Sequence, residues 1–196
     1  VQPNIGLRIK LVSAGQGRWS SSAGEHSKFG LNSIELMEAL QIAKDKNILD
    51  CIKLIHFHLG SQITNIRRIK NSLQEVGRFY SELMRFGCNI QYIDVGGGLG
   101  VDYDGSRSTF ASSTNYSVQE YANDVVYHLL EICNKENLPH PNIISESGRA
   151  MTAHHSILVV NVLDVTSFPE WSDTIEIEED APEVVKEIFH VLDSTS

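Results

Sequence analysis

The sequence predicts an α/β fold, in which a parallel sheet is built from alternating strands and helices. Apolar runs of strand length alternate with segments of helical period, which is the pattern of βαβ units. The 196 residues are 41% hydrophobic and 21% charged, an ordinary globular composition that is enough for one sizeable core or a large piece of one. The chain begins at Val1, directly before a strand-like run, so we interpret it as a segment of a longer polypeptide.

The predicted strands are short apolar runs, and they cover 5–11, 52–57, 90–95, 142–146 and 156–165. A helix over 64–86 is predicted from one apolar stripe whose members recur every three or four residues: Ile66, Ile69, Leu73, Val76, Tyr80 and Leu83. This stripe is expected to face the sheet, because the apolar side of an amphipathic helix packs on the core.

Two further helices are predicted from their first residues. Asn32 lies three residues before Glu35, and Ser117 lies three residues before Glu120. In such capping boxes the two side chains satisfy free backbone N–H groups at the start of a helix. The helices predicted in this way cover 33–45 and 118–135.

The chain is expected to divide into three segments. Residues 1–155 form part of a barrel of strands and helices, 156–167 is a strand that leaves it, and 168–196 is an acidic linker or insertion. The last segment includes a short amphipathic helix over 183–192. The stretch 102–116 is rich in Ser and Thr and aperiodic, so it is predicted to be a long surface loop.

Charge and cysteine content exclude several classes of function. A net charge of −9 without a Lys/Arg cluster argues against nucleic-acid binding, and it is compatible with a small cationic substrate. The three cysteines are separated by long intervals and form no CxxC pair, so neither a disulfide framework nor a thiolate zinc site is indicated. The longest apolar run, 157–163, is too short to cross a membrane.

Two histidines lie at the end of the second predicted strand, in the motif FHLGSQ (57–62). Strand alternation places Leu54, His56 and His58 on one face, which points into the barrel if helices cover the other. His56 is interpreted as a hydrogen-bonded interior histidine. His58 enters a turn at the position where α/β barrels carry functional residues. As an alternative, the HxH pair binds zinc in a metal-dependent hydrolase, with a third ligand from His154 or His155.

A glycine run, DVGGGLG (94–100), follows the third predicted strand. It does not fit the dinucleotide pattern GxGxxG, because Val101 stands where the last glycine is needed, and it lacks the lysine of a P-loop. Residues without Cβ allow backbone N–H groups to converge on an anion. The run is therefore either a phosphate-binding turn or a structural turn.

The motif ESGR (146–149) follows the fourth predicted strand and holds a carboxylate and a guanidinium three residues apart. One interpretation is a local ion pair between Glu146 and Arg149. In the other, Arg149 binds a phosphate with paired N–H donors, and Glu146 holds a proton on a heteroaromatic ring nitrogen. Pyridoxal phosphate (PLP) needs both of these contacts.

Together these motifs resemble the fold-type III PLP-dependent decarboxylases, whose catalytic domain is a (β/α)8 TIM barrel of the alanine racemase-like type. The resemblance covers about residues 1–165 and is strongest to the biosynthetic arginine decarboxylase family. It is carried by GQGRWSSSAGEHSKFG (15–30), LIHFHLGSQI (54–63) and SESGRA (145–150). Diaminopimelate decarboxylases share HxHxGSQ and GGGLG, but they usually have Glu-Pro-Gly-Arg where this chain has Ser147.

The resemblance implies that PLP is the cofactor and that L-arginine is converted to agmatine and CO2 in putrescine and spermidine biosynthesis. It implies that His58 stacks on the cofactor ring and that Glu146 pairs with the ring nitrogen; these two are the candidate catalytic residues. Arg8 would lie near the ring hydroxyl, and Asp94 would give structural support. The phosphate would be held by Ser61, the backbone of Gly97 and Gly98, Gly148 and Arg149.

The resemblance also has implications outside this chain. The lysine that carries the cofactor lies upstream of Val1, and a C-terminal β domain with a proton-donating cysteine lies downstream, so the segment alone is expected to be inactive. A homo-oligomer (dimer or tetramer), a magnesium requirement and a cytoplasmic location, or a plastid location in plants, are implied as well. The remaining alternative is a non-catalytic relative that regulates a partner.

Overall fold

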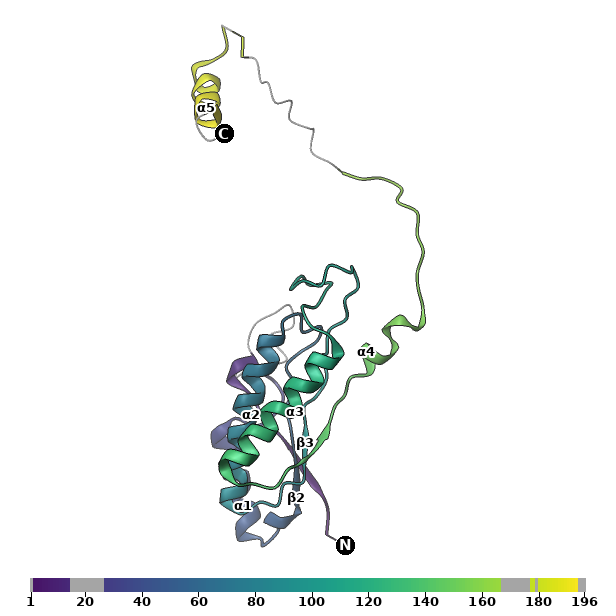
Figure 1. The fold of residues 1–196 in the computed structure, drawn as a ribbon. Helices are drawn as coiled ribbons and strands as arrows, with labels where there is room; N and C mark the ends of the chain where they lie inside the picture. Colours follow the sequence, from purple (N-terminus) through teal and green to yellow (C-terminus); the bar gives the residue numbers. More distant parts are fainter. Residues whose placement is uncertain (1, 15–26, 167–176, 179, 194–196) are drawn as a thin grey trace. The chain divides into compact units, whose positions relative to one another are not determined.

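The structure is a computed structural model that describes residues 2–14, 27–166, 177–178 and 180–193. The chain forms two compact units, Val1–Ile157 and Leu158–Ser196. The first unit contains a sheet and three long helices, and the second contains one helix (Figure 1). The approach segment 15–26, which contributes to the family resemblance, lies outside the described residues, and so does most of the acidic segment 168–182.

The sheet of the first unit has four parallel strands whose order in space follows their order in the chain. They are β1 (Ile5–Arg8), β2 (Ile52–His56), β3 (Tyr92–Asp94) and β4 (Asn142–Ile144). Each strand pairs in parallel with the next. Sequential pairing of this kind builds an arc of a (β/α) barrel, whereas a doubly wound sheet reverses its order at a switch point. The predicted α/β class is confirmed.

The first strand is shorter than the predicted 5–11. Next to the end of the strand, the N–H of Ile9 still donates to the carbonyl of His56 on β2 at 2.9 Å. Ile9 also forms an isolated bridge with Leu31, in which the N–H of Lys10 donates to the carbonyl of Leu31 at 2.9 Å and the N–H of Leu31 donates to the carbonyl of Arg8 at 2.8 Å. Ile9 and Leu11, the apolar residues beyond the end of the strand, are nevertheless buried. Hydrophobicity alone therefore predicts burial here but not sheet pairing.

Helices α1 (Ser33–Asp45), α2 (Ile66–Phe86) and α3 (Val118–Glu136) cover one face of the sheet (Figure 1). Both predicted capping boxes are confirmed. The side chains of Asn32 and Ser117 accept from the backbone of the first turn, and the carboxylates of Glu35 and Glu120 accept from the backbone N–H groups of Asn32 and Ser117. The start of α2 is two residues later than predicted, because the Asn65 side chain caps it by accepting from the backbone N–H of Arg67 at 2.9 Å.

The predicted stripe of α2 lies in the core of the first unit. Ile69, Leu73, Val76, Tyr80 and Leu83 are buried, and they form one cluster with sheet residues such as Ile55, Phe57 and Ile93. Strand alternation on β2 is also confirmed, since Ile55 and Phe57 are buried in this core while Leu54, His56 and His58 are only partly buried. The histidines therefore lie on the sheet face that is opposite the three helices.

The predicted loop 102–116 contains no helix or strand, as expected. Part of its C-terminal end is nevertheless buried: the Ser113 hydroxyl is fully enclosed, donates to Asp102 at 2.6 Å and accepts from the N–H of Ser108 at 3.0 Å. The segment is thus exposed over most of its length and buried at Ser113 and Thr114. Serines that look solvent-exposed in the sequence form an internal polar network, which satisfies the hydrogen bonds of buried hydroxyls.

After β4 the structure differs from the sequence prediction. A short helix, α4 (Gly148–Thr152), and a 3-10 turn, η4 (Ala153–His155), follow the sheet. The predicted strand at 156–165 is wrong: these residues have no strand pairing, and their apolar side chains are exposed. A β-branched run needs a neighbouring strand to pair with, and no described residue offers one.

The second unit contains α5 (Glu183–Asp193), at the place where the sequence predicts a short helix. Among the described residues, no helix combines the length and the hydropathy that crossing a bilayer requires.

Candidate functional site

Three of the sequence motifs meet at the carboxyl edge of the sheet. The loop after β2 contacts the loop after β3 through the N–H of Ile63, which donates to the carbonyl of Gly98 at 2.9 Å. The loop after β3 contacts the segment after β4 through the N–H of Glu146, which donates to the carbonyl of Gly96 at 2.9 Å. FHLGSQ, DVGGGLG and ESGR are therefore parts of one continuous surface, although they are far apart in the sequence.

The segment KFG (28–30), which ends the family-like stretch 15–30 and is the fourth motif of the site, lies beside the end of β1. The ring of Phe29 stacks on the Arg8 guanidinium, with 5.2 Å between Cζ and the ring centroid. Gly30 has φ +87, and a Cβ there would lie 3.2 Å from the Arg8 carbonyl oxygen. Arg8 is thereby held by an aromatic contact at the same edge of the sheet as the other motifs.

The glycine run is required for the close approach of the loops. Gly96 and Gly98 have φ +68 and +93, and a Cβ would lie 2.2 Å from the Phe57 carbonyl oxygen and 1.9 Å from the Gly60 carbonyl oxygen, respectively. Asp94 supports the turn, since its Oδ1 accepts from the N–H of Gly96 at 2.9 Å. The structural-turn interpretation therefore holds for these glycines; Gly96 is buried, whereas Gly97 and Gly98 are partly exposed.

Gly98→Ala is expected to separate these two loops. An alanine at positive φ costs about 1–2 kcal/mol, and its Cβ would also collide with the Gly60 carbonyl. The measurement is hydrogen exchange of peptides that cover 57–64 and 95–101 in the full-length protein, and we expect faster exchange there. Gly105→Ala is the matched control, because Gly105 has φ +75 but open space around its Cβ position. Equal acceleration in the two variants would contradict the collision.

Gln62 holds Val101, the residue directly after the glycine run, and this contact was not predicted from the sequence. Its Nε2 donates to the carbonyl of Val101 at 2.7 Å, and its Oε1 accepts from the N–H of Val101 at 3.0 Å. The side chain amide thus pairs with the backbone as a neighbouring strand would. The available signal is a glutamine at the end of a Gly-Ser-Gln turn, but its partner 39 residues away is not visible in the sequence.

A group of ionisable side chains lies on the sheet face opposite the helices, at the carboxyl edge. His56 Nε2 lies 3.5 Å from Glu146 Oε2, and the side chains of His56, Asp94 and Glu146 offer atoms that all lie within 4.8 Å of one another. In the described part of the chain Glu146 forms no ion pair with Arg149, so a local Glu146–Arg149 pair is not observed. Arg149 is exposed in the first turn of α4.

His58 lies beside this group, and its surroundings favour the neutral imidazole. Burial lowers the pKa of His58 most, and the positive charge of Arg8 and the neighbouring His56 lower it further, against the opposing effect of Glu146 and Asp94. A pKa below the ordinary value of 6.5 keeps the ring uncharged at neutral pH. An uncharged, half-buried imidazole is suited to stacking on another aromatic ring.

The zinc alternative requires His58 together with His154 or His155. The candidate ligand group in the described residues contains His56 with two carboxylates, and it includes none of these three histidines. His154 and His155 are exposed in η4. The structure thus does not assemble the ligand set that the hydrolase hypothesis predicts.

Tyr121 of α3 is a second residue that sequence reasoning missed. Its pKa is raised by burial, and its hydrogen bonding with Ser145 and Ser147 opposes that rise. The hydroxyls of Ser145 and Ser147 also contact each other. Ser147 of ESGR therefore joins a hydroxyl network with α3, which a proline at this position is unable to form. The capping motif at Ser117 predicts the helix but not this contact.

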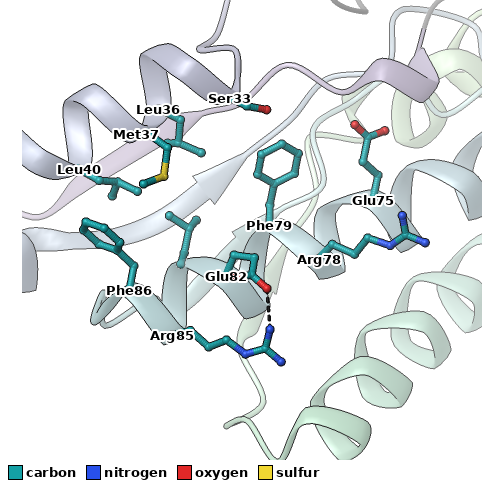
Figure 2. A pocket seen from close by; sticks show the side chains of 11 residues that line it. Ser33, Leu36, Met37, Leu40, Glu75, Arg78, Phe79, Glu82, Arg85 and Phe86 are labelled. Carbon is teal, nitrogen blue, oxygen red and sulfur yellow. Dashed lines mark hydrogen bonds and ion pairs between the residues drawn. The ribbon is translucent and has the colours of Figure 1, made fainter.

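An apolar groove lies between α1 and α2, on the helical side of the unit (Figure 2). Met37, Phe79 and Phe86 project into it, and the ion pair of Arg85 with Glu82 lies at its rim. None of its lining residues belongs to the four motifs. The groove is therefore separate from the chemistry at the carboxyl edge.

Comparison with known proteins identifies a family whose matched domain contains all four motifs. Residues 1–153 match the family described as pyridoxal-dependent decarboxylase, pyridoxal binding domain. The biosynthetic arginine decarboxylases of Bacteroides thetaiotaomicron and Phocaeicola vulgatus are 55% and 52% identical over 99% of this chain, which in turn spans 31% of each relative. The chain thus corresponds to about a third of the length of these proteins.

Solved structures give the same fold. The crystal structure of the biosynthetic arginine decarboxylase from Campylobacter jejuni has a TM-score of 0.66 and 38% identity, over 98% of this chain and 30% of that one. A diaminopimelate decarboxylase from Helicobacter pylori, complexed with L-lysine, has a TM-score of 0.58 and 26% identity, over 75% of this chain and 34% of that one. Because the match to the pyridoxal-binding domain extends over residues 1–153, the chain belongs to the pyridoxal-dependent decarboxylases.

Proposed function

We propose that the full-length protein catalyses the PLP-dependent decarboxylation of L-arginine to agmatine and CO2, in the biosynthesis of putrescine and spermidine. The observation that carries this proposal is the convergence of four motifs on one edge of the sheet. There a carboxylate, a neutral imidazole and a glycine run lie together. The names of relatives at about 50% identity support arginine as the substrate.

The residues at the edge fit the ring of PLP. When bound, PLP supplies a protonated ring that accepts the electron pair left on Cα after CO2 departs. In this proposal Glu146 pairs with the ring nitrogen and keeps it protonated by direct charge attraction. His58 stacks on the ring, and its neutral state avoids repulsion with a protonated ring. Arg8, which Phe29 holds in place, lies near the ring hydroxyl.

The same surface fits a phosphate group. Gly98 is packed against Gly60, so Ser61 follows directly beside the glycine run. On the other side, an added Cβ at Gly148 meets nothing within 4 Å, and Arg149 forms no ion pair among the described residues. We infer that the phosphate is held by the Ser61 hydroxyl, the backbone of Gly97 and Gly98, Gly148 and the Arg149 guanidinium. Arg149 supplies the paired donors that a phosphate prefers.

The full-length protein tests this proposal directly. It is purified with added PLP, its bound cofactor is measured by absorption, and CO2 release is followed from L-arginine, diaminopimelate and L-ornithine. Release from arginine alone is the expected result. Release from diaminopimelate alone would assign the protein to the related decarboxylase with which it shares HxHxGSQ and GGGLG. Bound cofactor without CO2 release from any substrate would favour a non-catalytic relative. A homo-oligomer, a magnesium requirement and a cytoplasmic location stay predictions.

A further inference from the structure

A row of charged and polar side chains crosses the sheet next to the candidate catalytic carboxylate. Arg8 of β1 is in register with His56 of β2, and His56 is in register with Asp94 of β3. Partners in a parallel ladder point to the same side, so these three side chains share the face opposite the helices. Asp94 is in turn paired with Ile144, two residues before Glu146.

His56 has an unusual environment within this row. Its Nε2 is buried and has no hydrogen-bond partner among the described residues. Buried polar atoms are nearly always hydrogen-bonded, so such an atom requires an explanation. Glu146 Oε2, a hydrogen-bond acceptor, lies 3.5 Å from this nitrogen. A shift of a few tenths of an ångström would close this distance to a normal hydrogen bond.

The charges around His56 come from each neighbouring element. Arg8 on β1 is in register with His56, and His58 lies two residues further along the same chain segment. Asp94 on β3 and Glu146 after β4 are two carboxylates that repel each other, and a donor between them offsets this repulsion. Asp94 already accepts from the N–H of Gly96 at 2.9 Å. The Glu146 side chain is about half exposed, and no backbone N–H of the described residues bonds its carboxylate.

We propose that His56 is a positioning residue for Glu146: its Nε2–H donates to one carboxylate oxygen and leaves the other for the ring nitrogen. The proposal rests on the proposed function, because that function gives Glu146 its partner. Without this bond the Glu146 side chain can rotate into solvent, and its pairing with a ring becomes intermittent. His56 does not touch the substrate in this account.

The test compares two amides that differ in reach. His56→Gln places an amide nitrogen near the position of Nε2, whereas the shorter side chain in His56→Asn ends near the position of Nδ1. We expect His56→Asn to lower kcat by about tenfold, the loss typical of one hydrogen bond to a charged group. KM should change little. His56→Gln should restore most of the turnover. Leu54→Val, two residues before His56 on the same face of β2, is the packing control.

Two readouts separate positioning from a structural role. In the protein loaded with ring-15N-labelled PLP, the nitrogen chemical shift reports ring protonation without turnover, and it should move toward the neutral form in His56→Asn only. In the cofactor-free protein, a double-mutant cycle of His56→Asn and Glu146→Gln should give non-additive shifts of the melting midpoint. Equal behaviour of the Asn and Gln variants, or additive shifts, would overturn the proposal. If the cycle shows coupling between His56 and Glu146 but the wild-type protein binds no PLP, the proposed function is overturned and the contact between the two residues stands.

Discussion

Replacing Glu146 by glutamine is expected to lower kcat by about a hundredfold, the scale of losing one preorganised electrostatic contact. Glutamine keeps the shape of the side chain but removes the charge that holds a proton on the ring nitrogen. The phosphate contacts lie elsewhere on the edge, so the affinity for PLP should change by less than about tenfold, or 1.4 kcal/mol. Single-turnover CO2 release and a cofactor titration on the full-length protein measure the two quantities separately.

The matched control is Glu131→Gln, which makes the same chemical change on the exposed side of α3. It should leave turnover and cofactor affinity unaltered, because this position is outside the four motifs. An unchanged kcat in Glu146→Gln would remove Glu146 from the catalytic account. A parallel loss of cofactor binding and turnover would instead assign Glu146 a role in holding the site together.

Local signals in the sequence were sufficient for most of the helices. The capping boxes at Asn32 and Ser117 fix the starts of α1 and α3, since both partners of each box lie within four residues. The α2 stripe likewise depends only on spacing along one helix, and it is buried as predicted. Interactions of this short range are encoded in the order of residues, so they can be inferred without tertiary information.

The extent of strand pairing was harder to predict than the positions of the helices. In the run at 5–11 only Ile9 and Leu11 are buried, and the ladder with β2 covers only Ile5–Arg8. The run at 156–165 has an equally strong β-branched pattern but no pairing at all. Propensity describes how well a residue fits a pleated surface, and it does not supply the neighbouring strand.

The motifs of the site were predictable, but the contacts that join them were not. His58, Glu146 and the glycine run stand out because each follows a strand, where parallel α/β folds carry functional residues. The roles of Gln62 and Tyr121 could not be predicted, because the residues that they contact lie far along the chain. His56 was interpreted as a satisfied interior histidine, whereas its Nε2 lacks a hydrogen bond among the described residues.

Replacing Arg149 by alanine is expected to have the opposite signature to the Glu146 variant. The guanidinium is the only positive side chain in the proposed phosphate set, and a charge-assisted hydrogen bond contributes about 1.5–3 kcal/mol. The dissociation constant of PLP should therefore rise by roughly ten- to a hundredfold. At saturating PLP most of the turnover should return, since Arg149 does not contact the reacting atoms in this proposal.

The design of the Arg149 experiment depends on geometry as well as charge. Arg149→Lys keeps the positive charge but loses the planar fork, so its affinity for PLP should fall between those of the wild type and Arg149→Ala. Arg67→Ala, an exposed arginine in the first turn of α2, controls for a general loss of positive charge. If excess PLP fails to restore turnover in Arg149→Ala, the guanidinium acts on the reaction itself, and the phosphate assignment is wrong. Full retention of PLP by Arg149→Ala would also contradict the phosphate assignment, because the remaining donors would then hold the phosphate without the guanidinium.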